Sequence, residues 1–554
     1  MGPAFYALAA LLRSKSLIAL LALFTHYILN IGEWDNKFHL VLITWATAFG
    51  GAVTIEYAAD PEVNSVGAAV RISMMLAVTY FSVLLTSMLL HRGFFHRLRK
   101  IPGPFLARFT KFHSIFAGVL PTNFQFFKWQ VELRERYGTD VIRTGPREVT
   151  VYCADAVPLI HGPTSRCKRA TIYNVLGDLF GRSIQLTTDK NEHRHRRKIW
   201  DRAFNAKALR EYEPRLNRHA FALISKLKEM ADQPSIRITD WLNFYSFDVM
   251  GDIGFNRSFG MVKNGKEDNM IKLLHDSQAA VSIFEHISWA MNLAGRIPAA
   301  AKPLTEHVHW SRKVLEQRAK NTPKENDIFS WLLTPGDERV TMDMNADSRL
   351  LIIAGSDTTA ATLSYLIYEL CLNPAIQTTL HTAIATINPE TPYLSVSDLT
   401  DCEYLDGVIH ETLRLHPAVP SGAARETPPE GLTLPNGTYI PGAVSVWIPM
   451  YSLQRDARYW VDPLTFMPER WSAANTSAIK DKRAFLPFLT GAYNCVGQKL
   501  AIMEMRSVVA NFVRQFEVGF AEGEDGGCIE RESRDCFTMT VGKLDVKLTP
   551  RHES

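Results

Sequence analysis

The sequence has few of the features that disulfide-stapled or nucleic-acid-binding proteins need. Its seven cysteines are odd in number, and none belongs to a Cys-x-x-Cys pair. This excludes a disulfide framework, a zinc ribbon and an ordinary iron–sulfur cluster as the leading interpretations. The formal net charge is only +4, with 21% charged residues, so we expect no nucleic-acid partner. The scattered cysteines fit a reducing compartment, in which a single thiolate can serve as a ligand.

The N-terminal hundred residues contain three long apolar stretches, at 17–31, 39–58 and 72–90. A helix that spans a bilayer needs about 20 apolar residues. The second and third stretches reach that length, whereas the first does so only if it begins before Arg13 and Lys15. A cleavable signal peptide explains one such stretch and not three. Core helices are the alternative, but three successive stretches without amphipathic periodicity argue against it. We expect a membrane anchor of one to three spans.

Charges around these stretches predict how the anchor is oriented. The basic run HRLRK at 96–100 directly follows the third stretch, and basic residues at a membrane edge favour the cytosolic side. Three spans would then put Arg13 and Lys15 in the lumen, against this bias. One or two spans, with the remainder at the interface, would remove the conflict. The turn KIPGP follows, and its prolines break a helix. We therefore expect an anchor over 1–99 and a catalytic domain over 100–554.

The globular part is expected to be mainly α with a small β portion. Apolar residues recur with helical periodicity in six segments, namely 122–138, 204–231, 303–320, 344–372, 374–387 and 402–415. Strand patterns are confined to 140–151, 432–447 and 537–548, and the last of these alternates as a hairpin would. These patterns predict one α-rich domain.

One cysteine, Cys495, lies between a glycine-containing loop and an amphipathic helix, in the stretch FLPFLTGAYNCVGQKLA at 485–501. A thiolate at a helix N-terminus is stabilised by the helix dipole and by free backbone N–H groups, and those groups can tune a bound metal. Gly491 and Gly497 permit the close approach of a flat macrocycle, and Phe488 would shield the sulfur from water. The alternative is an inert buried thiol.

A polar string interrupts the apolar helix expected at 344–372. AGSDTT occupies 354–359, between the apolar flanks LLII and ATLSYLI. Burying an aspartate and two threonines is costly unless they have partners, and threonine hydroxyls can loosen the local backbone ladder. We therefore expect Gly355, Asp357 and Thr358 to form a polar notch in this helix rather than a patch that faces solvent.

Two further motifs are rich in arginine. Glu411 and Arg414 of HETLRLHP are three residues apart, so they share a helix face and can pair, and Arg470 follows in FMPERW. HRHRRKIWDRAF at 193–204 contains His193 and Arg197. Guanidinium groups suit bidentate recognition of carboxylates. Much of this last motif is also expected to be an ordinary solvated basic face.

In their order and spacing, over about residues 100 to 550, these motifs resemble those of cytochromes P450. Phe488, Gly491, Cys495 and Gly497 match the family's haem-binding signature. The family usually has a basic residue two positions before the cysteine, where it meets a haem propionate, and this chain has Tyr493 there. A tyrosine hydroxyl can donate one hydrogen bond but brings no positive charge.

The resemblance implies roles for the other motifs. AGSDTT resembles the oxygen-activation motif of the family's central helix, with Thr358 as the proton-delivery hydroxyl and Asp357 as its acidic neighbour. Glu411, Arg414 and Arg470 resemble the Glu–Arg–Arg cluster that fixes the family's core, a structural role. The same resemblance implies that Arg197, His193 and Arg425 contact the haem propionates. His193 takes the place of the usual tryptophan.

The resemblance also implies a haem b cofactor (iron protoporphyrin IX), bound by Cys495 as axial ligand, and a cytochrome P450 fold behind N-terminal transmembrane helices. The sequence has no flavin or nicotinamide fingerprint, and we expect no reductase domain in the same chain. Electrons should come from NADPH through a separate NADPH–cytochrome P450 reductase, with cytochrome b5 as a candidate second donor. Lys482, Arg483 and Lys499 are candidate docking residues. The expected location is the endoplasmic reticulum membrane, with the catalytic domain in the cytosol.

Substrate contacts are expected at 165–190, at 280–295, along 350–358 and at 418–424. These segments contain the apolar residues Ile172, Val175, Ile283, Phe284, Ile353 and Val419. A hydrophobic small molecule is therefore expected. The motif YNCVG and the multi-span anchor resemble those of fungal enzymes of specialised metabolism.

Three other functions remain as alternatives. A haem-thiolate isomerase or dehydratase would use no oxygen, but the intact SDTT string argues against it. A non-catalytic membrane protein could bind haem or lipid without turnover. A cysteine hydrolase would need a histidine base near Cys495, and no such context is visible.

Overall fold

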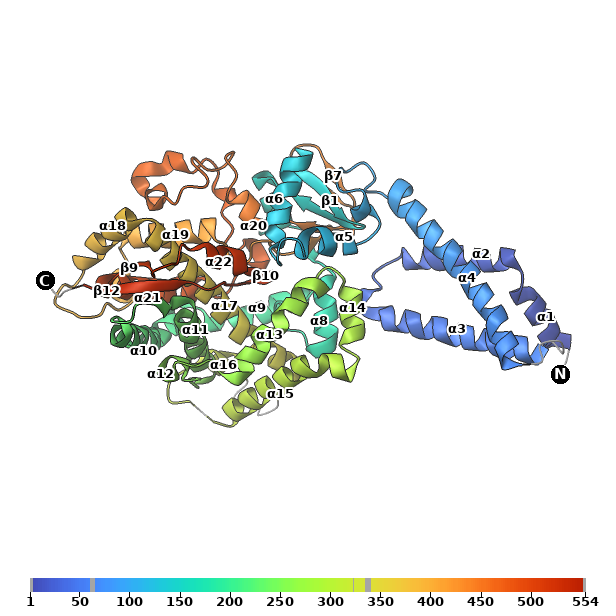
Figure 1. Cartoon of the computed structure of the whole chain (residues 1–554), viewed down its shortest axis with the longest axis horizontal. Helices are drawn as coiled ribbons and strands as arrows, with labels where there is room; N and C mark the ends of the chain where they lie inside the picture. Colours follow the sequence, from blue (N-terminus) through green and yellow to red (C-terminus); the bar gives the residue numbers. More distant parts are fainter. Residues whose placement is uncertain (1–2, 60–64, 322, 334–339, 552–554) are drawn as a thin grey trace.

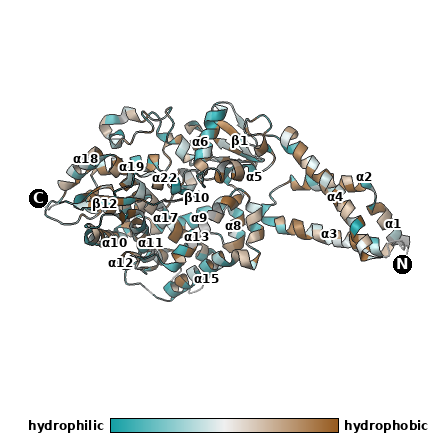
Figure 2. Ribbon diagram, viewed as in Figure 1, coloured by the Kyte–Doolittle hydropathy of each residue, from teal (hydrophilic) through white to brown (hydrophobic). Residues whose placement is uncertain are grey.

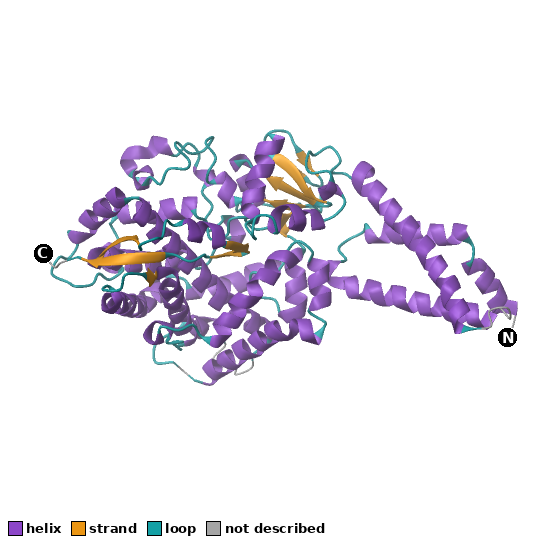
Figure 3. Cartoon of the chain, in the orientation of Figure 1, coloured by secondary structure: helices purple, strands orange, loops and turns teal. Residues whose placement is uncertain are grey.

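The computed structural model describes residues 3–59, 65–321, 323–333 and 340–551, and it consists of an elongated N-terminal anchor and a larger body (Figure 1). Helices make up most of the chain, whereas the strands are short and gathered in small sheets (Figure 3). The predicted fold class, mainly α with a small β portion behind N-terminal apolar helices, is confirmed.

The anchor consists of four helices: α1 (Pro3–Leu12), α2 (Lys15–Leu29), α3 (Phe38–Ala59) and α4 (Val66–Leu90). Ser14 and Ser65 precede α2 and α4 and accept backbone N–H groups of the first turns, as N-cap residues do. By length and composition, Asp35–Ala59 and Val66–Phe95 can each cross a membrane, and α1 with α2, bent by 65° at their junction, can form another span. Residues of high hydropathy recur along these helices (Figure 2), so the chain is membrane-associated.

An ion pair lies inside the anchor. Arg13, at the bend between α1 and α2, donates to Glu56 of α3 with an Nη2–Oε2 distance of 2.6 Å, and the Glu56 side chain is 0% exposed. In the sequence analysis, a three-span anchor placed Arg13 in the lumen, against the usual charge bias. The ion pair compensates that charge within the helix bundle, because a charge in a low-dielectric medium needs a partner.

The longest helix, α17 (Met342–Leu372), also passes the length and composition test for a membrane span. In its most apolar window 72% of the residues are buried, against 6% in that of α3 and 11% in that of α4. α17 is therefore the central helix of the body and not a span. It packs against α11 (Ile238–Phe255), α19 (Glu403–Leu415) and α21 (Gln498–Gln515).

Gly355 is needed where α11 crosses α17. A Cβ added at Gly355 would lie 2.6 Å from the sulfur of Met250 on α11, so a larger residue would require the Met250 side chain to move. Thr341 caps the N-terminus of α17 by accepting the N–H of Met344. Pro374 at the start of the next helix sets the other boundary, because proline favours the first helical position.

All six predicted helices of the body are present: α6 (Phe126–Tyr137), α10 (Ala206–Met230), α15 (Pro298–Lys320), α17, α18 (Pro374–Ala385) and α19. The other body helices are α5 (Phe112–Ser114), α7 (Val157–Ile160), α8 (Ile172–Phe180), α9 (Lys190–Ala203), α12 (Met261–Asn264), α13 (Asn269–Phe284), α14 (Ser288–Ala294), α16 (Ile328–Leu332), α20 (Met450–Leu453) and α22 (Gly527–Glu532).

The largest sheet has the strand order β1-β2-β8-β5-β3. Its strands are β1 (Val141–Gly145), β2 (Glu148–Val151), β8 (Ser445–Trp447), β5 (Arg425–Glu426) and β3 (Lys168–Arg169). Only β2 and β8 run parallel. In the antiparallel pair of β3 and β5, Arg169 lies directly opposite Arg425.

The remaining strands form three smaller sheets. They pair β4 (Ile236–Arg237) and β9 (Phe516–Phe520) with β12 (Asp545–Pro550), β10 (Arg534–Cys536) with β11 (Thr538–Thr540), and β6 (Leu432–Thr433) with β7 (Tyr439–Ile440). The hairpin expected at 537–548 is therefore wrong, because β11 and β12 belong to different sheets. Alternation predicts that a segment is a strand, but it does not specify which strand pairs with it.

The turn between α2 and α3 lies on the body. Asn36 donates to Asp178 of α8 over 2.9 Å, and His39 Nδ1 lies 2.9 Å from the side-chain oxygen of Asn292 on α14. In Figure 1 one end of each of α3 and α4 lies at the body and the other end at the far side of the anchor. The anchor therefore meets the body beside α8 and α14.

Candidate active site

The Cys495 loop is held by its own backbone. The N–H of Cys495 donates to the carbonyl oxygen of Phe488 over 2.9 Å. Gly491 has a φ of +73°, and a Cβ there would lie 2.2 Å from the carbonyl oxygen of His161, so glycine is required at this turn. The helix α21 begins immediately after Gly497. The loop thus presents its cysteine at a helix N-terminus, as the sequence predicts.

Two opposing effects act on the sulfur of Cys495. The side chain keeps accessible surface, but burial by the surrounding protein raises the pKa of the thiol by more than the backbone N–H group of Gly497, the charge of Arg197 and the N–H group of Gln498 lower it. These donors stabilise negative charge on sulfur, and a bound cationic metal would complete that stabilisation. Gly497 leaves room beside the sulfur, since its Cβ position is 3.9 Å from Sγ.

Two buried arginines lie against the Tyr493 ring. The guanidinium carbon of Arg169 is 4.6 Å from the ring centroid and that of Arg425 is 4.8 Å from it. Their exposed fractions are 8% and 2%. Burial lowers the pKa of Arg169 to about 9, with the charge of Arg425 as the next cause. Within the described chain neither guanidinium forms an ion pair with a carboxylate. Like charges at facing strand positions repel, so this pair fits an anionic group between or beside them.

Other polar atoms around Tyr493 also lack partners within the described residues. The Tyr493 hydroxyl, Nε of Arg425 and both ring nitrogens of His161 are buried and form no hydrogen bond. His193 packs its ring 4.5 Å from that of Tyr493, and burial together with Arg169 and other arginines lowers its pKa to about 3. His193 is therefore a neutral donor at physiological pH. Unsatisfied buried groups carry a desolvation cost that a bound acidic ligand would relieve.

Arg197 is placed differently from His193. Its Nη1 donates to the carbonyl oxygen of Asn494 over 2.7 Å, and its Nε donates to Asp201 over 2.7 Å. It thereby ties α9 to the residue before Cys495. Sequence reasoning missed Arg169 and His161, although it found Tyr493, His193, Arg197 and Arg425. The run RCKRA around Arg169 gives no periodic or motif signal, and only the pairing of β3 with β5 brings Arg169 opposite Arg425.

The polar notch of α17 is present as predicted in outline. Asp357 is 6% exposed, and the Thr358 hydroxyl donates to the carbonyl oxygen of Ala354 over 2.7 Å. Ala354 and Thr358 stand four residues apart on one face and keep partial accessibility, whereas Ser356 and Thr359 are buried. This face of the central helix can therefore offer a hydroxyl to a ligand.

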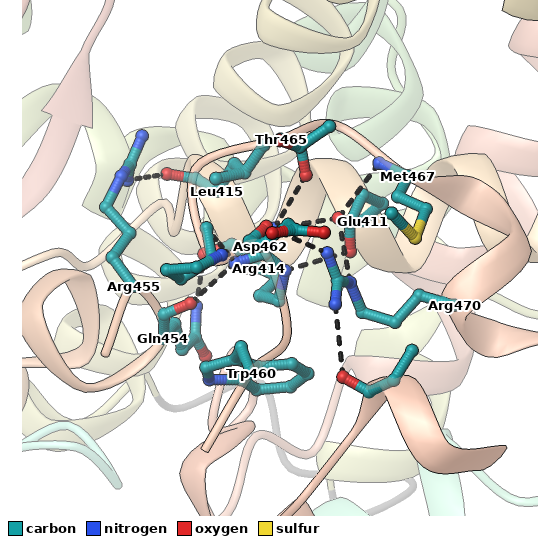
Figure 4. A network of polar contacts seen from close by, with 12 residues as sticks. Glu411, Arg414, Leu415, Gln454, Arg455, Trp460, Asp462, Thr465, Met467 and Arg470 are labelled. Carbon is teal, nitrogen blue, oxygen red and sulfur yellow. Dashed lines mark hydrogen bonds and ion pairs between the residues drawn. The ribbon is translucent and has the colours of Figure 1, made fainter. Parts of the chain in front are cut away.

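Glu411, Arg414 and Arg470 form a fully buried cluster (Figure 4). Glu411 Oε1 lies 2.7 Å from Arg414 Nη2 and 3.2 Å from Arg470 Nε. The arginines also donate to main-chain carbonyls, among them those of Gln454 and Ala478. The cluster joins α19 to the segment 461–478, which precedes the Cys495 loop in the chain.

The segments expected to contact substrate are partly apolar and accessible. Ile172, Ile283, Phe284, Ile353 and Val419 keep accessible surface, whereas Val175 is 1% exposed and belongs to the protein interior. Ile172 and Phe537, from the turn between β10 and β11, pack on the same small cluster as Tyr173.

Two carboxyl groups lie in the same region, and sequence reasoning did not find them. Glu285 and Asp535 line a small cavity together with Ser282 and Ser421. Burial raises the pKa of Glu285 to about 8, with Asp535 as the next cause, and raises that of Asp535 to about 7. Ser421 donates to Asp535 over 2.5 Å. The region is therefore not uniformly apolar.

Comparison with known proteins gives a consistent family assignment. The model of the cytochrome P450 family matches residues 111–548. A cytochrome P450 monooxygenase, FCK2, of Fusarium pseudograminearum is 35% identical over 97% of each chain. Tryprostatin B 6-hydroxylase of Neosartorya fischeri is 34% identical over 93% of each chain, and the monooxygenase nodW of Hypoxylon pulicicidum is 29% identical over 96% of this chain and 97% of its own.

The chain belongs to the cytochrome P450 family. Within it, the chain is a monooxygenase of the kind found in fungal secondary metabolism. Membership implies a haem cofactor and a supply of electrons from a redox partner. Arg169 and Arg425, which have no carboxylate partner among the described residues, and the cysteine at the start of α21 fit such a group, because haem combines an iron with two carboxylates.

Proposed function

We propose that this chain is a haem-thiolate monooxygenase in which Cys495 is the axial ligand of haem b. The observation that carries the proposal is the Cys495 thiol at the start of α21, with the N–H groups of Gly497 and Gln498 directed at it. Phe488 packs against the main core beside this loop and would keep water from the sulfur. Gly491 gives the loop the turn it needs.

Arg169, Arg425, His193 and Tyr493 would hold the haem propionates. Tyr493 brings no charge, and the two arginines against its ring supply the positive charge that the usual basic residue would bring. Arg197 would act through the Asn494 carbonyl by fixing the loop. In this arrangement the propionates separate the two facing guanidiniums and satisfy their free N–H groups.

The haem, when bound, supplies the activation of dioxygen, which thiolate ligation favours. The residues of the notch move protons. Asp357 would take up protons from the solvent side. The Thr358 hydroxyl, which donates to the carbonyl oxygen of Ala354 in the structure, would rotate to pass them towards dioxygen. The apolar side chains near Ile353 and Phe284 bind a hydrophobic small molecule and exclude water, so that one oxygen atom enters its C–H bond.

We propose that electrons come from NADPH through a separate NADPH–cytochrome P450 reductase, with cytochrome b5 as a second donor. Lys482 and Lys499 are exposed near the Cys495 loop, as a docking surface requires. Arg483 contributes less, because its guanidinium already pairs with Asp481 over 2.7 Å and with Asp155. Reversing the charge of both lysines should slow reduction and weaken its salt dependence; unchanged reduction would remove this surface from the proposal.

Residues 1–99 are proposed to anchor the protein in the endoplasmic reticulum membrane, with the catalytic domain 100–554 in the cytosol. Support comes from the apolar helices α3 and α4 and from the basic residues after α4. The substrate is proposed to be a fungal secondary metabolite. Support comes from the similarity of this chain, over nearly its full length, to the fungal enzymes Tryprostatin B 6-hydroxylase and FCK2.

The test uses purified full-length protein in detergent with haem supplied during expression. Wild type should show the haem-thiolate spectrum of the reduced carbon monoxide complex and consume NADPH and oxygen with added reductase. Cys495→Ala should lose both, whereas Cys528→Ala, at a half-buried cysteine on α22, should keep both. Wild-type protein without haem, or full turnover by Cys495→Ala, would refute the proposal. Product formation without oxygen consumption would instead favour an isomerase or dehydratase.

A further inference from the structure

The acidic residue of the notch is contacted from a helix that none of the motifs includes. His275 lies on α13, 82 residues before Asp357 in the chain, and its Nε2 is 3.3 Å from Oδ1 of Asp357. Its other ring nitrogen, Nδ1, is 2.7 Å from Oε1 of Glu267. Glu267 precedes α13, so three residues from two segments form one chain of polar contacts that ends on the central helix.

The exposure of these side chains falls step by step toward α17. Glu267 is 30% exposed, His275 is 21% exposed and Asp357 is 6% exposed. The contacts therefore run from the protein surface to the buried end of the notch. The ring of Phe247, on α11, packs edge-on against the His275 ring with centroids 5.5 Å apart, which restricts its rotation.

The charge state of His275 follows from its partners. A carboxylate only accepts hydrogen bonds, and His275 has one at each nitrogen, so both nitrogens carry a proton. Burial lowers the pKa of His275, but the hydrogen bonds and charges of Asp357 and Glu267 outweigh burial and raise it to about 10. The charged groups that face the ring are these two acids, and Asp240 of α11 acts on Glu267 from farther out.

We propose that His275 is a positioning residue for Asp357: the positive charge of the His275 ring stabilises the Asp357 carboxylate and orients it at the entrance of the proton path. The inference rests on the proposed monooxygenase function. An almost fully buried carboxylate without a cation nearby favours its neutral form. With the imidazolium in place, the Asp357 carboxylate is held at the notch and can accept each incoming proton. Without the imidazolium, this buried carboxylate loses one counter-charge, and we expect proton delivery to depend on pH.

The activity test uses the haem-loaded full-length protein with NADPH and reductase, without added substrate, and measures hydrogen peroxide released per NADPH consumed between pH 6 and 9. In His275→Gln this ratio should change by about tenfold or more across the range, while wild type stays nearly constant. His275→Lys restores a cation and should restore the wild-type profile. His219→Gln is the matched control, because His219 makes a similar contact, 2.9 Å to Asp252, away from the notch.

A second readout does not depend on turnover. Diethyl pyrocarbonate modifies neutral imidazole, so the His275 ring should be labelled slowly at pH 7, as mass spectrometry of peptides would show. Glu267→Gln removes one of the two acids and should increase that labelling at least about tenfold, since each pKa unit is a factor of ten in the neutral fraction. Labelling of His275 that is fast in wild type, or unchanged in Glu267→Gln, would overturn the inference.

The outcomes separate this inference from the proposed function. If wild type binds no haem, the proposed function fails and the positioning role fails with it. If wild type binds haem and consumes NADPH, but His275→Gln keeps the flat profile, only the positioning role is overturned. If His275→Gln does not retain haem, two other measurements decide whether the positioning role holds. They are the pH profile of peroxide release in His275→Lys and the diethyl pyrocarbonate labelling of His275 in wild type and Glu267→Gln.

Discussion

Glu411→Gln tests how much the buried Glu411–Arg414–Arg470 cluster stabilises the fold. Glu411 is 0% exposed and accepts five hydrogen bonds, from Arg414 Nε (2.9 Å) and Nη2 (2.7 Å), Arg470 Nε (3.2 Å), the Met467 N–H (3.0 Å) and Trp471 Nε1 (3.0 Å). Glutamine preserves the volume but removes the negative charge and turns one acceptor into a donor.

The magnitude follows from burial. Both arginines are at most 1% exposed, so the substitution leaves two guanidinium charges inside the protein without a counter-charge. Breaking a buried pair in this way costs about 3–5 kcal/mol. A more exposed ion pair provides the control, because Asp406, also on α19, bonds to Arg506 of α21 over 2.6 Å with both side chains partly exposed. Asp406→Asn should cost about 0–1 kcal/mol.

The assay is denaturant unfolding of the full-length protein in detergent, followed by tryptophan fluorescence, with haem retention measured from the reduced carbon monoxide spectrum. Glu411→Gln should lower the free energy of unfolding by several kcal/mol and release haem at lower denaturant, because the cluster supports the segment before Cys495. A loss no larger than that of Asp406→Asn would refute the reasoning from burial.

Three further predictions concern other buried charges. Burial holds the pKa of Glu285 at about 8, above its ordinary value, so the folded state loses stability as pH rises from about 4.5 to 8; Glu285→Gln should remove that loss, seen as a flatter pH dependence of the melting temperature. Arg169→Gln should speed the transfer of haem to apomyoglobin by about ten- to a hundredfold, since a charged hydrogen bond is worth about 1.5–3 kcal/mol; a rate equal to wild type would remove Arg169 from the haem site. Glu56→Gln should destabilise the anchor in detergent by about 1–3 kcal/mol, because Arg13 loses its carboxylate, whereas Lys15→Gln should change the thermal stability little.

Much of the candidate site could be predicted from the sequence, because the relevant residues lie close together in the chain. Cys495 with Gly491 and Gly497, the AGSDTT string, and Glu411 with Arg414 are each contained in a single loop or helix. Their spacing is read directly, since backbone geometry over a few residues is nearly the same in every protein. The helices of the body were predicted for the same reason, with ends displaced by a few residues.

Contacts between distant segments could not be predicted in that way. Arg169 meets Arg425 only because β3 pairs with β5, and β12 joins β9 rather than β11. Strand alternation carries no information about partners. His275 reaches Asp357 only because folding brings α13 close to α17 at this pair of side chains. The apolar pattern of α17 also did not distinguish a core helix from a membrane span, because both are apolar on all sides.

The amino-acid sequence by itself determined the family, the Cys495 loop at the start of a helix, the central helix with its polar string and the presence of an apolar anchor, since each depends on the order of neighbouring residues. Only the tertiary structure decided which charges meet: Arg13 with Glu56, Arg169 with Arg425 around Tyr493, and Glu267 with His275 and Asp357. The reason is that the energy of a charge depends on the burial and the partners that folding gives it, and neither is a local property of the chain.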